Sequence, residues 1–354
     1  MKSGQLELEP VIEDESEEVV PFKYSISSYG ADYTVDSLVK RLDDDTIFNP
    51  PFQRGFVWSL GDASRFIESL LLGLPVPGIF LAKEQESRRL LVVDGQQRLR
   101  TLQMFYDGIF VNKKEFALKG VQKQFAGLTY KTLPSSDKRQ LDDSIIHATI
   151  IKQDEPSEDD SSIYYVFQRL NTTGIELKPQ EIRACIYHGE FSDLLGELNK
   201  STAWRKVFGP VHKSMRDQEL IVRFLALYFD GDDYEKPLNT FLNKYMGRNR
   251  HLKQQSKSEI KAAFNPTIEI ATEALGETAF TRKALNAAVF DSVMVGLAAR
   301  LSRGRIKNVD EVRAQYKKLF EKDEFRDATE KSTTDEEAVE RRLDIATQAF
   351  ASVR

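Results

Sequence analysis

The chain has 354 residues, of which 41% are hydrophobic and 10% aromatic, and its formal net charge at pH 7 is -5. This composition excludes a disordered protein and supplies enough apolar side chains for one large core or for two domains. The longest apolar runs are broken by charge, glycine or proline before the roughly 20 residues that a membrane span requires, so we expect no association with a membrane.

The negative charge is concentrated at the N-terminus. The first 20 residues contain seven carboxylates and one lysine, and the remaining chain is close to neutral. We interpret residues 1–21 as an acidic, disordered leader; the alternative is that this leader competes with nucleic acid for a basic groove. It resembles no export signal, and the single cysteine, Cys185, excludes an intramolecular disulfide. We therefore expect a cytoplasmic protein.

Residues 22–160 alternate between strand and helix patterns, which predicts a mixed α/β domain. Thr34 and Ser59 are expected to cap the first two helices, and Gly73 to end the second. An acidic loop is expected over residues 153–162. The predicted strands are residues 22–29, 79–83, 90–93 and 144–151, and the predicted helices begin near residues 35, 60, 97 and 135.

Residues 161–354 are expected to form an all-α domain, which makes the fold class α+β. Residues 216–229 place Leu220, Phe224 and Leu227 on one stripe, and residues 285–301 are apolar enough for a buried central helix. The last segments show the periodicity of amphipathic helices.

The most informative stretch is LLVVDGQQRLRTLQMF, residues 90–105. A buried strand breaks at Asp94 and Gly95 and is followed at once by a helix with two arginines in its first turns. A helix N-terminus has unpaired N–H groups and a partial positive charge, so cations are unfavourable there unless an anion lies nearby.

This turn has the parts of a phosphate cradle. Gly95 permits close approach of the backbone, the N–H groups of residues 96–98 would point outward, and Arg98 adds a forked charged donor. Thr101 is expected beside Arg98 on a flanking face, while Leu99 and Leu102 face the core. The alternative is an ordinary turn in which Arg98 pairs with a surface carboxylate.

Two other segments could complete such a site. In the extended sequence PFQRGFVW, the side chains of Phe52, Arg54, Phe56 and Trp58 share a face that could stack a base and hold a phosphate, or could simply pack the core. In FQRLNTTGIELKPQE, residues 171–174 are expected to form a polar turn between two helices, which is either a connector or a loop that positions a substrate.

Several catalytic classes lack their signatures. The chain has no G-x-x-x-x-G-K-[ST] loop, and its four histidines, His147, His188, His212 and His251, are too dispersed to predict a metal site. Basic clusters at residues 247–253 and 300–307 could contact nucleic acid, but we favour a solvated surface as their explanation.

The motifs together resemble the N-terminal domain of GmrSD-type restriction endonucleases, a family similar in fold to ParB and sulfiredoxin. The resemblance covers residues 22–246. It is carried, in order, by NPPFQRGFVW, SLLLGLPVPGIFL, VVDGQQRLRTL, LNTTGIELKPQEIRACIYHGEF and MRDQELIVRF.

This resemblance implies a site for a nucleoside triphosphate with Mg²⁺. In the superfamily the segment matching residues 94–98 binds phosphates, and an R-x-F-x-W element falls on Arg54, Phe56 and Trp58. The residues expected in catalysis are Asp94, Gln97, Arg98 and Arg54. Those expected to bind the nucleotide are Gly95, Gln96, Gln97, Arg98, Thr101, Phe56, Trp58, Asn171, Thr173, Gly174 and Glu181.

The chain departs from its relatives in two ways. Sulfiredoxin has a cysteine where this chain has Gln96 and Gln97, so sulfiredoxin chemistry is not expected. Full-length GmrSD-type nucleases add an HNH-like domain, but after Met246 only His251 could serve such a centre. We therefore expect any nuclease to be a separate chain.

The predicted function is that of a nucleotide-binding and nucleotide-hydrolysing protein of a bacterial anti-phage or restriction-type system. Its nucleotide state would regulate binding to DNA or to an effector chain, and it could form homo-oligomers. One alternative is a non-enzymatic DNA-binding or sensing module whose Arg98 pocket grips a DNA phosphate; another is a scaffold in which the motif has only a structural role.

Overall fold

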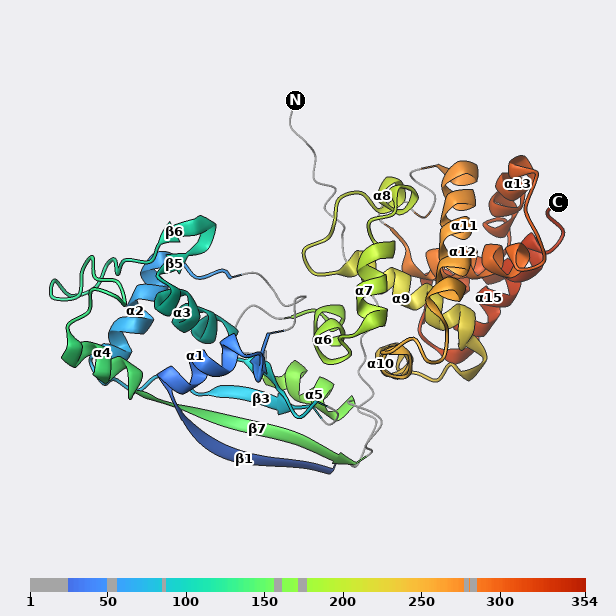
Figure 1. Cartoon of the computed structure of the whole chain (residues 1–354). Helices are drawn as coiled ribbons and strands as arrows, with labels where there is room; N and C mark the ends of the chain where they lie inside the picture. The colour runs from blue at the N-terminus through green and yellow to red at the C-terminus, as the bar shows by residue number, and fades with distance from the viewer. Residues whose placement is uncertain are drawn as a thin grey trace. The chain divides into compact units, whose positions relative to one another are not determined.

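The computed structural model describes residues 25–49, 56–84, 87–155, 161–170, 177–276, 280 and 285–354. The chain divides into two compact units (Figure 1). The sheet unit comprises the described residues between 25 and 177 together with Ala184–Ile186, and the helical unit comprises Lys178–Arg183 and the described residues from Tyr187 to Arg354. Each unit is considered by itself below.

The sheet unit is built on a five-stranded mixed sheet with the order β1-β7-β3-β4-β2. β1 pairs antiparallel with β7, β7 parallel with β3, β3 antiparallel with β4, and β4 parallel with β2. These strands are β1 (Ser25–Thr34), β2 (Ile47–Phe48), β3 (Ile79–Lys83), β4 (Leu90–Asp94) and β7 (Ile145–Glu155); a separate two-stranded sheet contains β5 (Ile109–Phe110) and β6 (Lys114–Glu115).

The helices α1, α2 and α3 lie on one face of this sheet, above the strands in the view of Figure 1. Their apolar residues share one core with the inward-facing residues of the strands, such as Leu81, Val92 and Ile146. α5 packs against β4 and β7, where the alternate residues Leu91 and Val93 are also buried. The helices are α1 (Val35–Asp43), α2 (Leu60–Leu71), α3 (Gln96–Asp107), α4 (Ser135–Asp142) and α5 (Ser161–Leu170).

The predicted elements of this unit are present, with differences at their ends. Ser59 caps α2 through a capping box with Asp62, and Gly73 follows α2 with φ 68°, as expected. Thr34 precedes α1, but its hydroxyl donates to the Asp36 carboxylate instead of accepting from a backbone N–H. β1 is longer than predicted because it pairs with β7 up to Thr34.

The boundary between the units differs from the expected one at residue 160. It falls after residue 177, because α5 packs on the sheet. The predicted acidic loop over residues 153–162 overlaps regular elements at both ends, since β7 extends to residue 155 and α5 begins at residue 161; its middle part, residues 156–160, lies outside the described residues.

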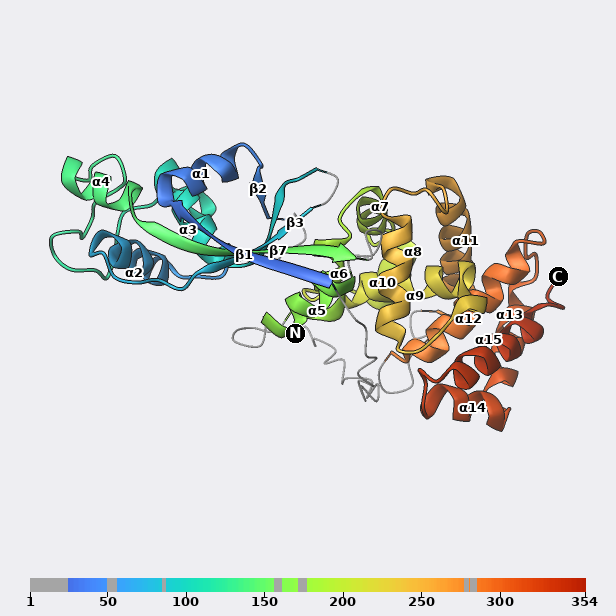
Figure 2. The same ribbon diagram turned by 90° about the horizontal axis from the view of Figure 1, so that it is seen from below.

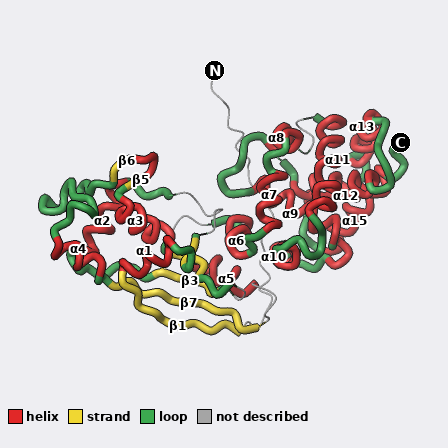
Figure 3. The backbone as a smooth tube through the Cα atoms, viewed as in Figure 1, coloured by secondary structure: helices red, strands yellow, loops and turns green. Residues whose placement is uncertain are grey.

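The helical unit contains no strand among its described residues, so the fold class α+β is confirmed (Figure 3). α12 contacts α9, α11, α14 and α15, and two views show it beside α9, α11 and α15 (Figures 1 and 2). The helices are α6 (Pro179–Ile186, of which Ala184–Ile186 group with the sheet unit), α7 (Glu190–Leu198), α8 (Thr202–Phe208), α9 (Arg216–Phe229), α10 (Leu238–Asn249), α11 (Lys257–Leu275), α12 (Ala287–Leu301), α13 (Val309–Leu319), α14 (Asp323–Glu330) and α15 (Glu336–Phe350).

α12 is the buried central helix that the sequence predicts, because every residue from Ala287 to Ala298 is buried. α9 is buried more completely than the predicted stripe requires, since Arg223 lies inside together with Leu220 and Phe224. No described helix is both long and apolar enough to cross a membrane.

Candidate functional site

The predicted turn is formed where β4 meets α3. β4 ends at Asp94, Gly95 has φ 101° and ψ 6°, and α3 begins at Gln96. A Cβ atom at position 95 would lie 2.4 Å from Cγ2 of Ile79 on β3. Glycine is therefore required both by the left-handed backbone and by the close approach of the neighbouring strand. Ile79 lies 16 residues before Gly95 in the chain, and no local sequence pattern predicts that the two residues are in contact.

Arg98 turns back toward the strand end and pairs with Asp94. Its Nη2 atom donates to Oδ2 of Asp94 over 2.7 Å, and the Arg98 side chain is 15% exposed whereas that of Asp94 is 47% exposed. Nε of Arg98 is buried and has no hydrogen-bond partner in the described part of the chain. The alternative of a carboxylate partner for Arg98 is therefore realised, and that partner is Asp94 of the same motif.

Gln97 connects the start of α3 to the segment that precedes α2. Its side-chain oxygen accepts hydrogen bonds from the backbone N–H groups of Val57, at 2.9 Å, and Trp58, at 3.3 Å. The predicted catalytic residue Gln97 thus uses its amide oxygen to position a neighbouring segment. The sequence alone gives no sign of this contact, which joins residues 39 and 40 positions apart.

The aromatic residues of that segment pack inward. Phe56 meets Phe110 edge to face at a centroid distance of 5.5 Å, and Trp58 meets Phe66 in the same manner at 5.7 Å. Both rings pack against the core of the sheet unit, which agrees with the core-packing alternative. Phe52 and Arg54, the other members of the predicted face, lie outside the described residues.

Thr101 does not lie on an accessible flanking face, and this prediction is wrong. Its side chain is fully buried, and its hydroxyl donates to the backbone oxygen of Gln97 over 2.7 Å. A threonine can be buried in a helix when the preceding turn satisfies its hydroxyl in this way. Thr101 therefore offers no donor to a ligand in this structure.

The other predicted residues have different locations in the chain. Gln96 is half-buried at the first position of α3. Glu181 belongs to the helical unit, where it is 2% exposed and accepts the backbone N–H of Lys178 as a capping residue of α6. Three predicted residues fall outside the described part of the chain: Asn171, Thr173 and Gly174.

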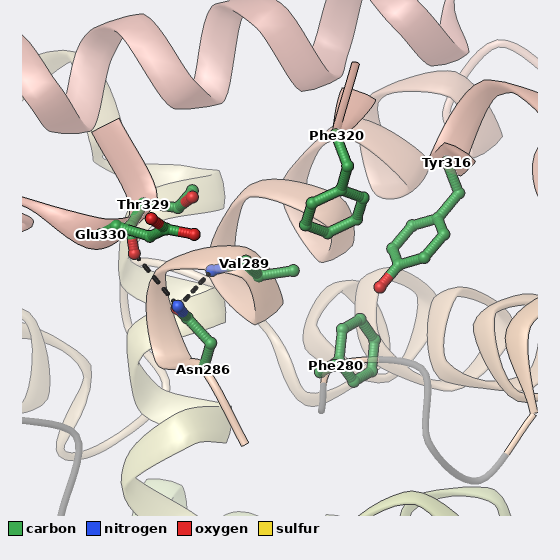
Figure 4. A pocket seen from close by; sticks show the side chains of 7 residues that line it. All are labelled: Phe280, Asn286, Val289, Tyr316, Phe320, Thr329 and Glu330. Carbon is green, nitrogen blue, oxygen red and sulfur yellow. Dashed lines mark hydrogen bonds between the residues drawn. The ribbon is translucent and has the colours of Figure 1, made fainter. Parts of the chain in front are cut away.

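Other features of the described residues add no candidate metal centre. Asp32 and His147 pair across β1 and β7 at 2.8 Å, but no group of three or more potential metal ligands gathers in the described ranges. A pocket in the helical unit contains none of the predicted site residues; there Asn286 donates to the backbone oxygen of Thr329 (Figure 4). The residues that line this pocket are Phe280, Asn286, Val289, Tyr316, Phe320, Thr329 and Glu330.

The sheet unit is thus a mixed α/β domain in which a glycine turn leads from a buried strand into a helix with an arginine in its first turn. Residues 35–188 match the family model of the N-terminal domain of the GmrSD restriction endonuclease. This match confirms, for this part of the chain, the family indicated by the motifs, and the description of that family points to a restriction-type system.

The matched region contains the whole Asp94–Arg98 turn but ends before the motif MRDQELIVRF at residues 215–224. The resemblance inferred from the motifs is therefore supported over residues 35–188. No curated protein matches the chain.

Proposed function

We propose that the sheet unit binds a nucleoside triphosphate with Mg²⁺ at the start of α3 and hydrolyses it, and that the nucleotide state controls binding to DNA or to a separate effector chain of a restriction-type system. The observation that carries this proposal is the turn at Asp94–Arg98. Its left-handed glycine leads directly into the first turn of α3, whose N–H groups have no acceptor within the helix itself, and a charged forked donor lies in the same turn.

The Asp94–Arg98 pair is suited to exchange with a phosphate group. The Arg98 side chain is mostly buried, whereas the Asp94 side chain is 47% exposed. An ion pair that is open to water contributes little to stability, so a ligand with more negative charge can replace the carboxylate at small cost. The guanidinium uses only Nη2 for Asp94, and it can offer a forked pair of donors to phosphate oxygens.

The residues present also fit a magnesium ion that is bound with the nucleotide. Mg²⁺ in such complexes needs only one or two carboxylates, because phosphate oxygens and water supply its other ligands. Asp94 is exposed, and its Oδ1 forms no hydrogen bond with any described residue, so Asp94 is the residue that would hold the ion. The ion would neutralise phosphate charge as a Lewis acid, and Arg98 would remain available for the phosphate oxygens.

Calorimetric titration with ATP, GTP, CTP and UTP in the presence of Mg²⁺ tests this proposal. We expect at least one nucleotide to bind the wild type with micromolar affinity and to lose that binding in Arg98→Ala. Arg139→Ala is the matched control, because Arg139 is an exposed arginine of α4 in the same unit. A folded wild-type protein that binds none of the four nucleotides would contradict the proposal.

Hydrolysis is a separate question that needs its own assay. Release of phosphate from the bound nucleotide is expected to depend on Mg²⁺ and to fall in Asp94→Asn more than nucleotide affinity does. Salt titration separates the alternative in which Arg98 grips DNA, because binding to several DNA phosphates weakens steeply with salt and does not require a free nucleotide.

A further inference from the structure

The two arginines at the start of α3 have different surroundings. Arg98 pairs with Asp94, but Arg100 forms no hydrogen bond, ion pair or cation–π contact within the part of the chain that the structure describes. Arg100 is nevertheless partly buried, and this burial lowers the pKa of its guanidinium. It remains charged at neutral pH, because arginine has an ordinary pKa above 12.

The geometry of α3 directs Arg100 toward the helix start. Leu99, Leu102 and Phe105 are fully buried and define the core side of α3, and a rotation of about 100° per residue places Arg100 on the opposite side. Long side chains on a helix extend toward its N-terminus. From this geometry we infer that the guanidinium of Arg100 lies near the first turn of α3, on the side of Gln96, which is four residues earlier.

Neighbouring positions on both sides of Arg100 are held by specific contacts. Gln97 binds the backbone at Val57 and Trp58, and Gln103 donates to Oδ1 of Asp43 at the end of α1 over 2.9 Å. Arg100 lies between these two attachments on the outer side of the helix, and its side chain is only partly accessible to solvent.

Among the described residues, the charges around the turn leave the cation of Arg100 without a partner. Asp94 and Arg98 neutralise each other, while Arg100 adds a positive charge near a helix end that is already electropositive. A partly desolvated cation without a counter-charge is unfavourable in the free protein, and a bound anion removes that cost. This arrangement favours a ligand that carries more charge than Arg98 alone can neutralise.

We propose that Arg100 contacts an outer phosphate of the bound nucleotide and makes the site selective for triphosphates over monophosphates. This inference rests on the proposed function, since it assigns a second phosphate contact within the same site. Arg98 and the N–H groups of α3 would hold the phosphate next to the turn. Arg100 would bind an outer phosphate, farther from the helix axis. A nucleoside monophosphate has no such group.

Titration of wild type, Arg100→Ala and Arg100→Lys with the tri-, di- and monophosphate of the preferred nucleoside tests this assignment, and inorganic tripolyphosphate serves as a base-free probe. Arg100→Ala is expected to weaken triphosphate and tripolyphosphate binding roughly tenfold or more, which corresponds to the loss of a charge-assisted hydrogen bond, and to change monophosphate binding much less. Arg100→Lys should retain most of the selectivity, and Arg139→Ala all of it.

The outcomes separate this inference from the proposed function. If the wild type binds no nucleotide, the proposed function fails. If Arg98→Ala abolishes binding but Arg100→Ala binds all ligands as tightly as the wild type, or weakens all of them equally, the assignment to Arg100 is overturned and the proposed function stands. The melting temperature of Arg100→Ala should match that of the wild type, because Arg100 has no side-chain partner among the described residues. If that variant does not fold, Arg100→Lys and Arg100→Gln provide the same test.

Discussion

Arginine–carboxylate pairs occur in both units, but they differ in their contact with water. In the helical unit Arg223 and Arg342 share the carboxylate of Asp291, and the side chains of all three are at most 2% exposed. In the sheet unit the Arg98 side chain is 15% exposed and that of Asp94 is 47% exposed. The buried cluster can only stabilise one packing of its helices, whereas the open pair can exchange its partner for a ligand.

The buried cluster follows from the position of its helices. α9 and α12 are surrounded by other helices, so Arg223 and Asp291 must find their partners inside the unit. Burial lowers the pKa of Arg342 to about 10, and the neighbouring Asp291 carboxylate opposes this shift. The cluster therefore connects α9, α12 and α15 through one carboxylate.

The largest expected effect is the loss of this shared carboxylate. Asp291→Asn leaves two buried guanidiniums without their common counter-charge and is expected to lower the free energy of unfolding by about 3–5 kcal/mol, measured by urea denaturation. Glu337→Gln is the control on α15, where it breaks an exposed pair with Arg341 and should cost less than about 1 kcal/mol. Equal effects of the two substitutions would show that burial does not distinguish the pairs.

The next effect concerns the two glycines that flank α3. Gly95 and Gly108 both have positive φ, but a Cβ atom would collide with Ile79 only at Gly95 and would meet nothing within 4 Å at Gly108. We expect Gly95→Ala to cost about 2–4 kcal/mol, from backbone strain and overpacking, and Gly108→Ala about 1 kcal/mol from strain alone. Thermal unfolding measures both, and nucleotide affinity should fall only in Gly95→Ala.

A smaller effect is expected when the attachment of the neighbouring segment is removed. Gln97→Ala deletes the acceptor for the N–H groups of Val57 and Trp58, and should lower stability by about 1–2 kcal/mol. Gln97→Glu keeps an oxygen acceptor and should remain near wild-type stability in the same urea titration. If Gln97→Ala reduced hydrolysis without changing stability, a direct catalytic role would be the better explanation.

The smallest effect is expected at an exposed ion pair of the helical unit. Hydrogen bonds from Lys261 and Lys257 lower the pKa of Glu197 to about 2, from an ordinary value of 4.5. Since the folded state has the lower pKa, the pair stabilises above about pH 4.5, and its contribution disappears as the pH falls toward 2. Glu197→Gln should slightly lower the melting temperature at pH 7, and the difference from wild type should vanish over that acid range. A constant difference would contradict this assignment.

The sequence predicted the turn but not the environment of its side chains. The Asp-Gly break, the two flanking elements and the core positions Leu99 and Leu102 follow from local patterns, and the structure confirms them. Thr101 was misplaced because its hydroxyl is satisfied by the carbonyl of Gln97, which allows a polar residue to be buried. Periodicity alone cannot reveal that bond.

Contacts between residues that are far apart in the sequence could not be predicted from local patterns either. Residue 79, which fills the space behind Gly95, and residues 57 and 58, which bind Gln97, are near the turn only after the chain has folded. Glu181 shows the same limitation in another form. It is expected from the resemblance to bind the nucleotide, whereas in the structure its carboxylate caps α6.

The order of strands in the sheet unit also constrains when this unit can be completed during synthesis. β1 ends at Thr34, yet its hydrogen-bonding partner β7 begins only at Ile145 and also pairs with β3. A nascent chain therefore carries an unpaired first strand until more than a hundred further residues have left the ribosome, and closing so long a loop slows formation of the sheet. Any fragment that stops before β7 leaves β1 without this partner and exposes it to pairing with other chains.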